Sequence, residues 1–367
     1  MFKNLPKKKK IIIIVVSIIF GLAAGAAGFV AYKQYGPQKT ETKKSEPKPS
    51  PSPQTTANPL DGTQVPKDVA NRHPLAIIVE NHSQARPQTG LNKASIIYEA
   101  ISEGGITRFM AVYGPQDAQK VGPVRSLRTY FLDWAWEFKA FIAHVGGNID
   151  ALDRASQEQA FDLDEFALGE KAYWREPEAG KATEHTMYTS TEKLYKEAQA
   201  KGWDMKGDFT SFKFLNPKKF KVNSALTQNI TIDFSSPQYK VQYSWDSLNN
   251  NYPRKLAGSP HKDAATGNQL APTNIIIQSV ERWESPTRIN ENGWTMATIG
   301  SGKAYVLYGG QKIDATWKKT DLKSRTIFYD SNNKEIEFLP GQFWYEIVPP
   351  DVFEKVKIEA DTSTPTP

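Results

Sequence analysis

The chain has 367 residues, with 46 lysines and arginines, 40 aspartates and glutamates, and no cysteine. Residues 1–60 contain ten Lys and two Glu, a balance of +8, so the remaining chain has 36 basic and 38 acidic side chains. The part that can fold is nearly neutral, which argues against a nucleic-acid partner, because such domains carry a basic surface of their own. The lack of cysteine excludes disulfides, thiolate catalysis and lipidation at Cys.

An apolar segment near the N-terminus predicts a membrane anchor. The uncharged run 11–32 follows four lysines, Lys7–Lys10. At ~1.5 Å per residue a helix of this length spans the roughly 30 Å hydrocarbon layer. A cleaved signal peptide is the alternative, with the small residues 23–27 as a cleavage site, but the run exceeds the usual signal core of ~7–15 residues. We expect residues 1–10 to be cytoplasmic, a single membrane pass at 11–32, and an extracytoplasmic remainder.

Two segments have the composition of unstructured chain. Residues 33–70 are rich in Pro, Ser, Thr and Lys, and such a stretch buries too little apolar surface to repay the entropy of ordering. We expect a spacer there and a short tail at 356–367.

Residues 71–215 predict a mixed α/β domain. Short apolar runs at 74–79, 95–100, 106–113 and 140–145 are typical of buried strands. Helical spacing of aromatic residues predicts a helix at 129–138, and Asn148 is suited to cap a second helix over 149–161. Thr189 and Glu192 have the spacing of a capping box for a third helix ending near residue 201.

Residues 216–355 predict a smaller, mostly antiparallel β domain, a sandwich or a small barrel. Short β-type runs are separated by turns rich in Asn, Asp and Gly. The expected strands are 230–234, 239–245, 273–283, 294–299, 304–308, 326–329, 335–339 and 343–348. The fold class is therefore an α/β N-terminal domain followed by a β-rich C-terminal domain.

Several charged motifs of the α/β half follow a predicted strand or precede a predicted helix. Ligand sites in open α/β sheets form at such strand ends, and guanidinium groups bind phosphate or carboxylate in a fork. The candidate ligand-binding residues are Asn81, Arg86, Glu99, Arg108, Arg125 and Arg128. The alternative is that Glu99 and Glu103 neutralise these arginines in internal ion pairs.

Three residues are candidates for proton transfer: Glu103, His144 and His185. His185 lies in a polar loop, which suits a general base, whereas His144 ends an apolar strand, as buried hydrogen-bonded histidines often do. His261, in the β half, is expected in a surface turn. With no cysteine and five scattered histidines, we expect no transition-metal site and no cofactor.

The same motifs resemble the YerB-like lipoprotein family of bacteria. The similarity rests on 85–91, Glu103–Arg108, 122–126, 144–147 and 185–190, and extends to 302–304 and 339–342. It covers most of residues 70–350. The resemblance implies an α/β domain with a smaller C-terminal domain, and no defined activity. Family members that are lipoproteins anchor through a lipidated Cys, which this chain lacks, so the membrane helix would replace the lipid.

Three hypotheses about function follow. The first is a membrane-anchored envelope protein that binds an anionic envelope ligand or an envelope protein through an arginine-rich cleft. The second is an envelope hydrolase or transferase, in which the arginines stabilise developing negative charge and Glu103, His144 or His185 moves a proton. The third is a scaffold whose arginines and glutamates pair internally. The first ranks highest because no complete set of nucleophile, base and orienting group can be named.

Overall fold

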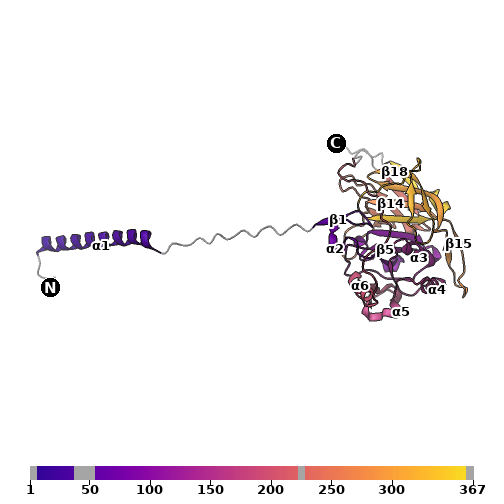
Figure 1. Ribbon diagram of the computed structural model, residues 1–367, viewed down its shortest axis with the longest axis horizontal. Helices are drawn as coiled ribbons and strands as arrows, with labels where there is room; N and C mark the ends of the chain where they lie inside the picture. The colour runs from indigo at the N-terminus through magenta and orange to yellow at the C-terminus, as the bar shows by residue number, and fades with distance from the viewer. Residues whose placement is uncertain (1–5, 37–53, 222–227, 361–367) are drawn as a thin grey trace. The chain divides into compact units, whose positions relative to one another are not determined.

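The computed structural model describes residues 6–36, 54–221 and 228–360. The chain divides into two compact units, Met1–Ser52 and Pro53–Pro367. In the first unit the helix α1 spans Lys7–Tyr35 (Figure 1), and none of its side chains is buried. Among the described residues it is the one helix long and apolar enough to cross a membrane, with a mean hydropathy of 2.6. Residues 37–53 of the expected spacer lie outside the described residues.

A ten-stranded mixed sheet forms the centre of the second unit, and each half of the sequence contributes five of its strands (Figure 1). In spatial order the strands are β19 (Ile327–Tyr329), β18 (Gln311–Lys319), β17 (Gly300–Tyr308), β14 (Asn274–Ser279), β20 (Phe343–Val348), β4 (Ile96–Ile101), β5 (Thr107–Tyr113), β3 (Leu75–Glu80), β6 (Phe141–His144) and β7 (Asp162–Asp164). The halves join where β20 runs parallel to β4.

A smaller sheet of five antiparallel strands comes from the C-terminal half. Its order is β13 (Ser259–Pro260), β12 (Arg254–Leu256), β11 (Lys240–Ser244), β10 (Gln228–Asp233) and β21 (Lys357–Ala360). Ile230, Val241 and Tyr243 of this sheet belong to the same buried cluster as Ile77 and Ile97 of the large sheet. The small sheet thus covers one face of the large one.

Helices complete the layers on both faces of the large sheet. On the face opposite the small sheet, α3 (Thr129–Trp136) and α4 (Ile149–Gln157) bury their apolar side chains. On the other face, α6 (Thr191–Ala200) packs into the core that also includes the small sheet. The short elements are α2 (Lys67–Ala70), α5 (Glu165–Leu168), α7 (Pro350–Phe353) and the strand pairs β1–β2 (Thr55–Ala57, Gln64–Pro66), β8–β9 (Tyr173–Arg175, Met187–Thr189) and β15–β16 (Arg282–Glu284, Trp294–Met296).

Side chains at the helix N-termini confirm one predicted cap and correct another. The Asn148 side chain accepts a hydrogen bond from the Ala151 N–H at 3.1 Å, as an N-cap residue does. At α6 the cap is Ser190 rather than Thr189, and its hydroxyl accepts from the Lys193 N–H at 3.2 Å. Thr189 instead ends strand β9 and donates its hydroxyl to the Ala172 carbonyl.

The fold class is confirmed, whereas several boundaries differ from expectation. Within the expected spacer, residues 55–57 and 64–66 form the β1–β2 pair and Leu60 is buried, so this part belongs to the folded unit. Residues 357–360, expected in the tail, form β21. The two halves share one large sheet, so residue 215 does not separate two independent β-sheets. The expected strand 335–339 buries its apolar side chains but pairs only through isolated bridges.

Candidate functional site

The alternation of side chains along each strand divides the candidate residues between the two faces of the large sheet. Tyr98 and Ala100 of β4 face the core beneath α3, so Glu99 between them faces the small sheet. Glu80 and Arg108 are paired in register on β3 and β5 and share the face of Ile78 and Met110. Glu99 is therefore separated by the sheet from Arg108, with which the sequence grouped it.

Glu99 belongs to a buried polar network between the two sheets. Its carboxylate forms an ion pair with Arg254 of the small sheet, and both side chains are fully buried. Arg254 also contacts the hydroxyl of Tyr243 at 3.0 Å and Nδ1 of His261 at 2.5 Å. Burial, then the neighbouring Glu99, raises the pKa of Glu346 well above its usual range. This network is closed to solvent and holds the two sheets together.

Arg86 lies on the same side of the large sheet as Glu99, and each of its three guanidinium nitrogens donates a hydrogen bond within the protein. Its Nε donates to Asn81 Oδ1 at 3.0 Å, Nη2 to the Asn81 carbonyl at 3.0 Å, and Nη1 to the Gln238 carbonyl at 2.9 Å. Its guanidinium lies over the ring of Tyr239, 5.0 Å from the centroid. Asn81 is fully buried and also donates to Thr107 at 2.7 Å. Arg86 thus connects the α/β half to the segment that joins β10 and β11, and Asn81 holds Arg86 in place.

Glu103 is bound between two of the predicted arginines. Arg128 donates from Nε to Oε1 of Glu103, and Nη2 of Arg108 lies 3.8 Å from Oε2. Burial alone would raise the pKa of Glu103, but Arg128 and Arg108 lower it to about 2. Burial and the neighbouring Arg128 lower the pKa of Arg108 to about 10. A carboxylate that stays ionised is a poor proton donor, so Glu103 is unsuited to general acid chemistry.

Arg125 lies beside Glu80 and two histidines, and we call Glu80, His82, Arg125 and His185 the Arg125 cluster. Arg125 Nε is 2.7 Å from Oε2 of Glu80, and His185 Nδ1 is 3.6 Å from the same oxygen. The imidazoles of His82 and His185 stack with centroids 4.7 Å apart and planes within 4°. The side chain of Glu80 is 3% exposed and that of Arg125 is 31% exposed.

Arg125 differs from the other three arginines in its hydrogen bonding. Its guanidinium makes no well-aligned hydrogen bond to any residue in the described ranges, although Nε is close to Glu80. Arg108 and Arg128 each donate to a backbone carbonyl, Ser126 and Leu127 respectively, as well as facing Glu103. Arg108 Nε is also without a hydrogen-bond partner, but its side chain is only 6% exposed, so Arg125 is the member of this group most accessible to a ligand.

His144 is a buried structural residue. Its side chain is fully buried, with Nε2 3.0 Å from Asp162 and Nδ1 2.8 Å from the Gly146 carbonyl. Burial lowers the pKa of His144, but Asp162 and Asp164 reverse that effect and leave it above its ordinary value. No three metal-ligating side chains come close enough to hold a metal ion within the part of the chain that the structure describes.

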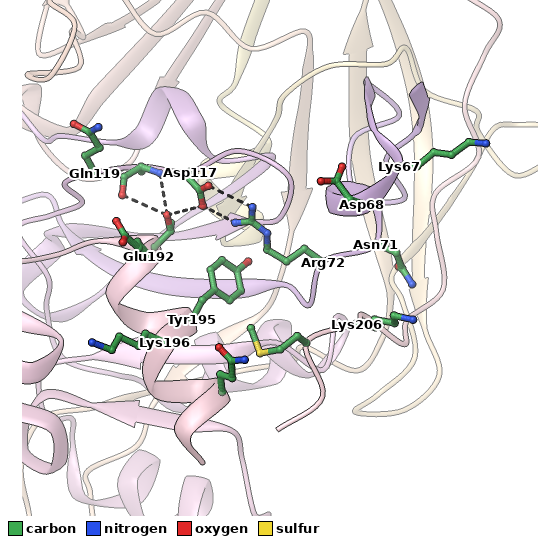
Figure 2. Close-up of a pocket in the computed structure, with 14 residues that line it drawn as sticks. Lys67, Asp68, Asn71, Arg72, Asp117, Gln119, Glu192, Tyr195, Lys196 and Lys206 are labelled. Carbon is green, nitrogen blue, oxygen red and sulfur yellow. Dashed lines mark hydrogen bonds and ion pairs between the residues drawn. The ribbon is translucent and has the colours of Figure 1, made fainter. Parts of the chain in front are cut away.

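A large open hollow lies elsewhere, between α2, α6 and the loop 117–119, with a volume of about 1050 Å³. Figure 2 shows Arg72 reaching Asp117 across it, with Nη1 to Oδ1 at 2.5 Å and Nη2 to Oδ2 at 3.3 Å. The guanidinium lies over the ring of Tyr195, 4.8 Å from the centroid. A hollow of about 410 Å³ continues beyond Asp117. Neither includes a predicted site residue, and both signs of charge line the larger one.

Sequence reasoning missed four residues that the structure places in these clusters. Glu80 and His82 flank the predicted residue Asn81, and the pairing of β3 with β5 places Glu80 beside Arg108. Arg254 carries no sequence signal, because it lies on a three-residue strand far along the chain. His261 was expected in a surface turn but is buried, with Nε2 2.9 Å from Gln88 Oε1.

The fold and the charged clusters define a mixed α/β protein with an antiparallel sheet on one face and an N-terminal apolar helix. The chain belongs to the DUF3048 family: residues 60–204 match "Protein of unknown function (DUF3048) N-terminal domain" and residues 230–345 match the C-terminal domain. A YerB protein is among the relatives of this chain, which confirms the resemblance predicted from the sequence.

Two comparisons with the same relative agree with the family assignment. The "Putative lipoprotein YerB" of Bacillus subtilis is 30% identical over 298 residues, which cover 79% of this chain and 86% of the relative. The crystal structure of the YerB protein from Bacillus subtilis superposes with a TM-score of 0.73 and 28% identity, covering 83% of this chain and 99% of that one. Together with α1, a lipoprotein relative indicates membrane association and an envelope location.

Proposed function

We propose that this protein is tethered in the bacterial envelope by α1 and binds an anionic group, carried by an envelope ligand or an envelope protein, at Arg125. One observation carries the proposal: of the four predicted arginines, Arg125 is the one whose guanidinium makes no aligned hydrogen bond within the described residues. Its side chain is 31% exposed, compared with 6% for Arg108 and 13% for Arg128. Arg86, Arg108 and Arg128 already donate to carbonyl or carboxylate oxygens.

The charges around Arg125 favour an anion. Three arginines, Arg108, Arg125 and Arg128, lie near two glutamates, Glu80 and Glu103, whereas a third glutamate, Glu184, is exposed and its charge is screened by solvent. Glu80 is nearly fully buried and holds the Nε edge of Arg125. A guanidinium fixed on one edge binds an oxyanion on its other edge at a smaller entropic cost than a free side chain.

The tether and the orientation are part of the proposal. The relative is named as a lipoprotein, whereas this chain contains no cysteine to carry a lipid. The helix α1 supplies an alternative attachment to the same membrane, and Lys7–Lys10 favour a cytoplasmic N-terminus. The folded unit would then be extracytoplasmic.

The enzyme hypothesis has less support than binding. Glu103 remains ionised and His144 is buried between two carboxylates, so neither is suited to proton transfer. His185 lies near Arg125, yet no hydroxyl or thiol nucleophile contacts it among the described residues.

The test uses the full-length protein in a nonionic detergent, immobilised and incubated with bacterial envelope extract. We expect retention of anionic material that is released by sulfate and is lost in Arg125→Ala. Arg288→Ala is the matched control, because Arg288 is an exposed arginine paired with Asp153 on the surface. Equal retention by Arg125→Ala would contradict the proposal, and chemical turnover of the extract would favour the enzyme hypothesis instead.

A further inference from the structure

His185 shares one carboxylate oxygen with Arg125. Oε2 of Glu80 lies 2.7 Å from Arg125 Nε and 3.6 Å from His185 Nδ1, while Oε1 accepts the backbone N–H of His82 at 3.2 Å. Glu80 therefore has one oxygen for two cationic partners. When His185 is neutral, Arg125 alone compensates the charge of Glu80.

The Nδ1 atom of His185 is buried without a hydrogen-bond partner among the described residues. The residue is 5% exposed and its ring is covered by the stacked ring of His82. An unpaired polar atom in a buried position is uncommon and calls for a physical explanation. Here the atom points toward Glu80 and Arg125, into the candidate anion site.

Four charged or titratable groups face His185. Glu80 lies at the end of β3, His82 follows it, Arg125 lies on the segment before α3, and the exposed Glu184 precedes His185 in sequence. Burial lowers the pKa of His185, and the attraction of Glu80 only partly opposes this. His185 is therefore neutral near pH 7 without a ligand. An anion beside it would reverse that balance by stabilising the imidazolium.

We propose that His185 is a positioning residue of the anion site, which takes up a proton as a doubly charged oxyanion of the phosphate or sulfate type docks at Arg125. This inference rests on the proposed function. With His185 neutral, Arg125 and Glu80 sum to zero charge, whereas the imidazolium brings the three groups to +1. The protonated Nδ1 then pairs with Glu80 and leaves Arg125 to the ligand. His82 is less suited to this role, because its Nδ1 accepts the Gln84 N–H at 3.3 Å.

Proton uptake makes anion binding depend on pH in a defined direction. Since the bound state holds one more proton than the free state, affinity rises as the pH falls below about 7, by at most tenfold per pH unit. The affinity for a monoanion such as acetate increases less when His185 becomes protonated, because the attraction between the two charges is weaker. Sulfate stays doubly charged throughout this range, so its pH dependence reports on the protein alone.

The test is calorimetric titration of the full-length protein in nonionic detergent with sulfate and with acetate, between pH 5.5 and 8. Repeating it in buffers of different ionisation enthalpy gives the number of protons taken up. We expect uptake of up to one proton with sulfate at pH 6 and less with acetate. His185→Gln should bind sulfate several-fold more weakly at pH 6 and without uptake. His82→Asn, which keeps an acceptor for the Gln84 N–H, should retain the uptake.

The outcomes separate this inference from the proposed function. If sulfate binds, and Arg125→Ala abolishes binding, but affinity is independent of pH, the role of His185 is wrong and the anion site stands. The role of His185 is also wrong if His82→Asn, and not His185→Gln, removes the uptake. If no anion binds to the native protein at any pH, both proposals fail. Should His185→Gln not fold, the upward shift of the His185 titration on adding sulfate, measured by NMR, replaces it, and no shift overturns the inference.

Discussion

Arg254 of the small sheet and Glu99 of the large sheet form an ion pair in which neither side chain is exposed to solvent. Burial alone would lower the pKa of Arg254, but Glu99 raises it above its ordinary value, so the guanidinium remains charged. The second carboxyl group nearby, Glu346, lies 3.8 Å from Arg254 Nε. The network joins the sheets by specific polar contacts in addition to apolar packing.

Breaking this pair is expected to destabilise the folded unit strongly. Arg254→Met leaves Glu99 charged and uncompensated, and loss of one partner of a buried pair typically costs about 3–5 kcal/mol. Glu99→Gln should cost less, because Glu346 can ionise and take its place beside Arg254. Chemical denaturation measures both free energies of unfolding. An exposed pair, Lys303 with Glu354, is the control, and Lys303→Ala should have little effect. Equal, small losses in all three variants would contradict the role given to the network.

The Glu103 carboxylate is expected to make stability depend on acid pH. Its pKa falls from 4.5 to about 2 on folding, so its ionised form stabilises the native state above pH 4.5. This contribution is lost as the pH falls from 4.5 toward 2. The difference in unfolding free energy between the native protein and Glu103→Gln should be about 2 kcal/mol at pH 7 and shrink over that range. A difference that does not change with pH would contradict the pairing with Arg128.

The N-terminal helix gives a prediction about topology. A helix of 29 residues is about 44 Å long, enough to cross the hydrocarbon layer and emerge on both sides. We expect an N-terminal epitope tag to remain on the membrane-bound protein and to be protected from protease added to intact protoplasts, while the folded unit is digested or released. An N-terminus found instead within residues 23–27 would establish a cleaved signal peptide.

The structure has Ser190 as the N-cap of α6, whereas the sequence predicted a capping box formed by Thr189 and Glu192. Ser190→Ala should cost about 1 kcal/mol, because its hydroxyl accepts the Lys193 N–H. Glu192→Ala should cost less, since Glu192 is exposed and no capping contact is found for it among the described residues. Thermal unfolding of the two variants gives the comparison, and a larger loss for Glu192→Ala would favour the predicted capping box.

Local sequence patterns predicted the buried strands of the N-terminal half well. The apolar runs near β3, β4 and β6 are continuous because these strands are buried on both faces, and continuous runs are readily recognised. Strand β18 was not predicted, although Ile313, Ala315 and Trp317 alternate with polar residues in the manner of a strand with one exposed face. The pairing of β20 with β4 joins residues about 250 positions apart, and no local pattern encodes such a contact.

Whether the candidate residues bind a ligand stays a prediction. The structure brings Arg108, Arg125 and Arg128 together around Glu80 and Glu103, as the sequence grouped the arginines. Glu99 lies on the other face of the sheet, because side chains alternate along a strand and grouping by proximity in sequence ignores that alternation. The pairing of Arg86 with Gln238 depends on the small sheet and had no local signal.

The most direct test of the account is the affinity of the full-length protein for sulfate at pH 6, compared between the native protein, Arg125→Ala and Arg86→Ala. The two arginines differ in that Arg86 has every guanidinium nitrogen in a hydrogen bond, whereas Arg125 has donors to spare. The account predicts that Arg125→Ala weakens sulfate binding at least tenfold, while Arg86→Ala lowers stability and leaves binding within about twofold. Unchanged binding in Arg125→Ala would contradict it.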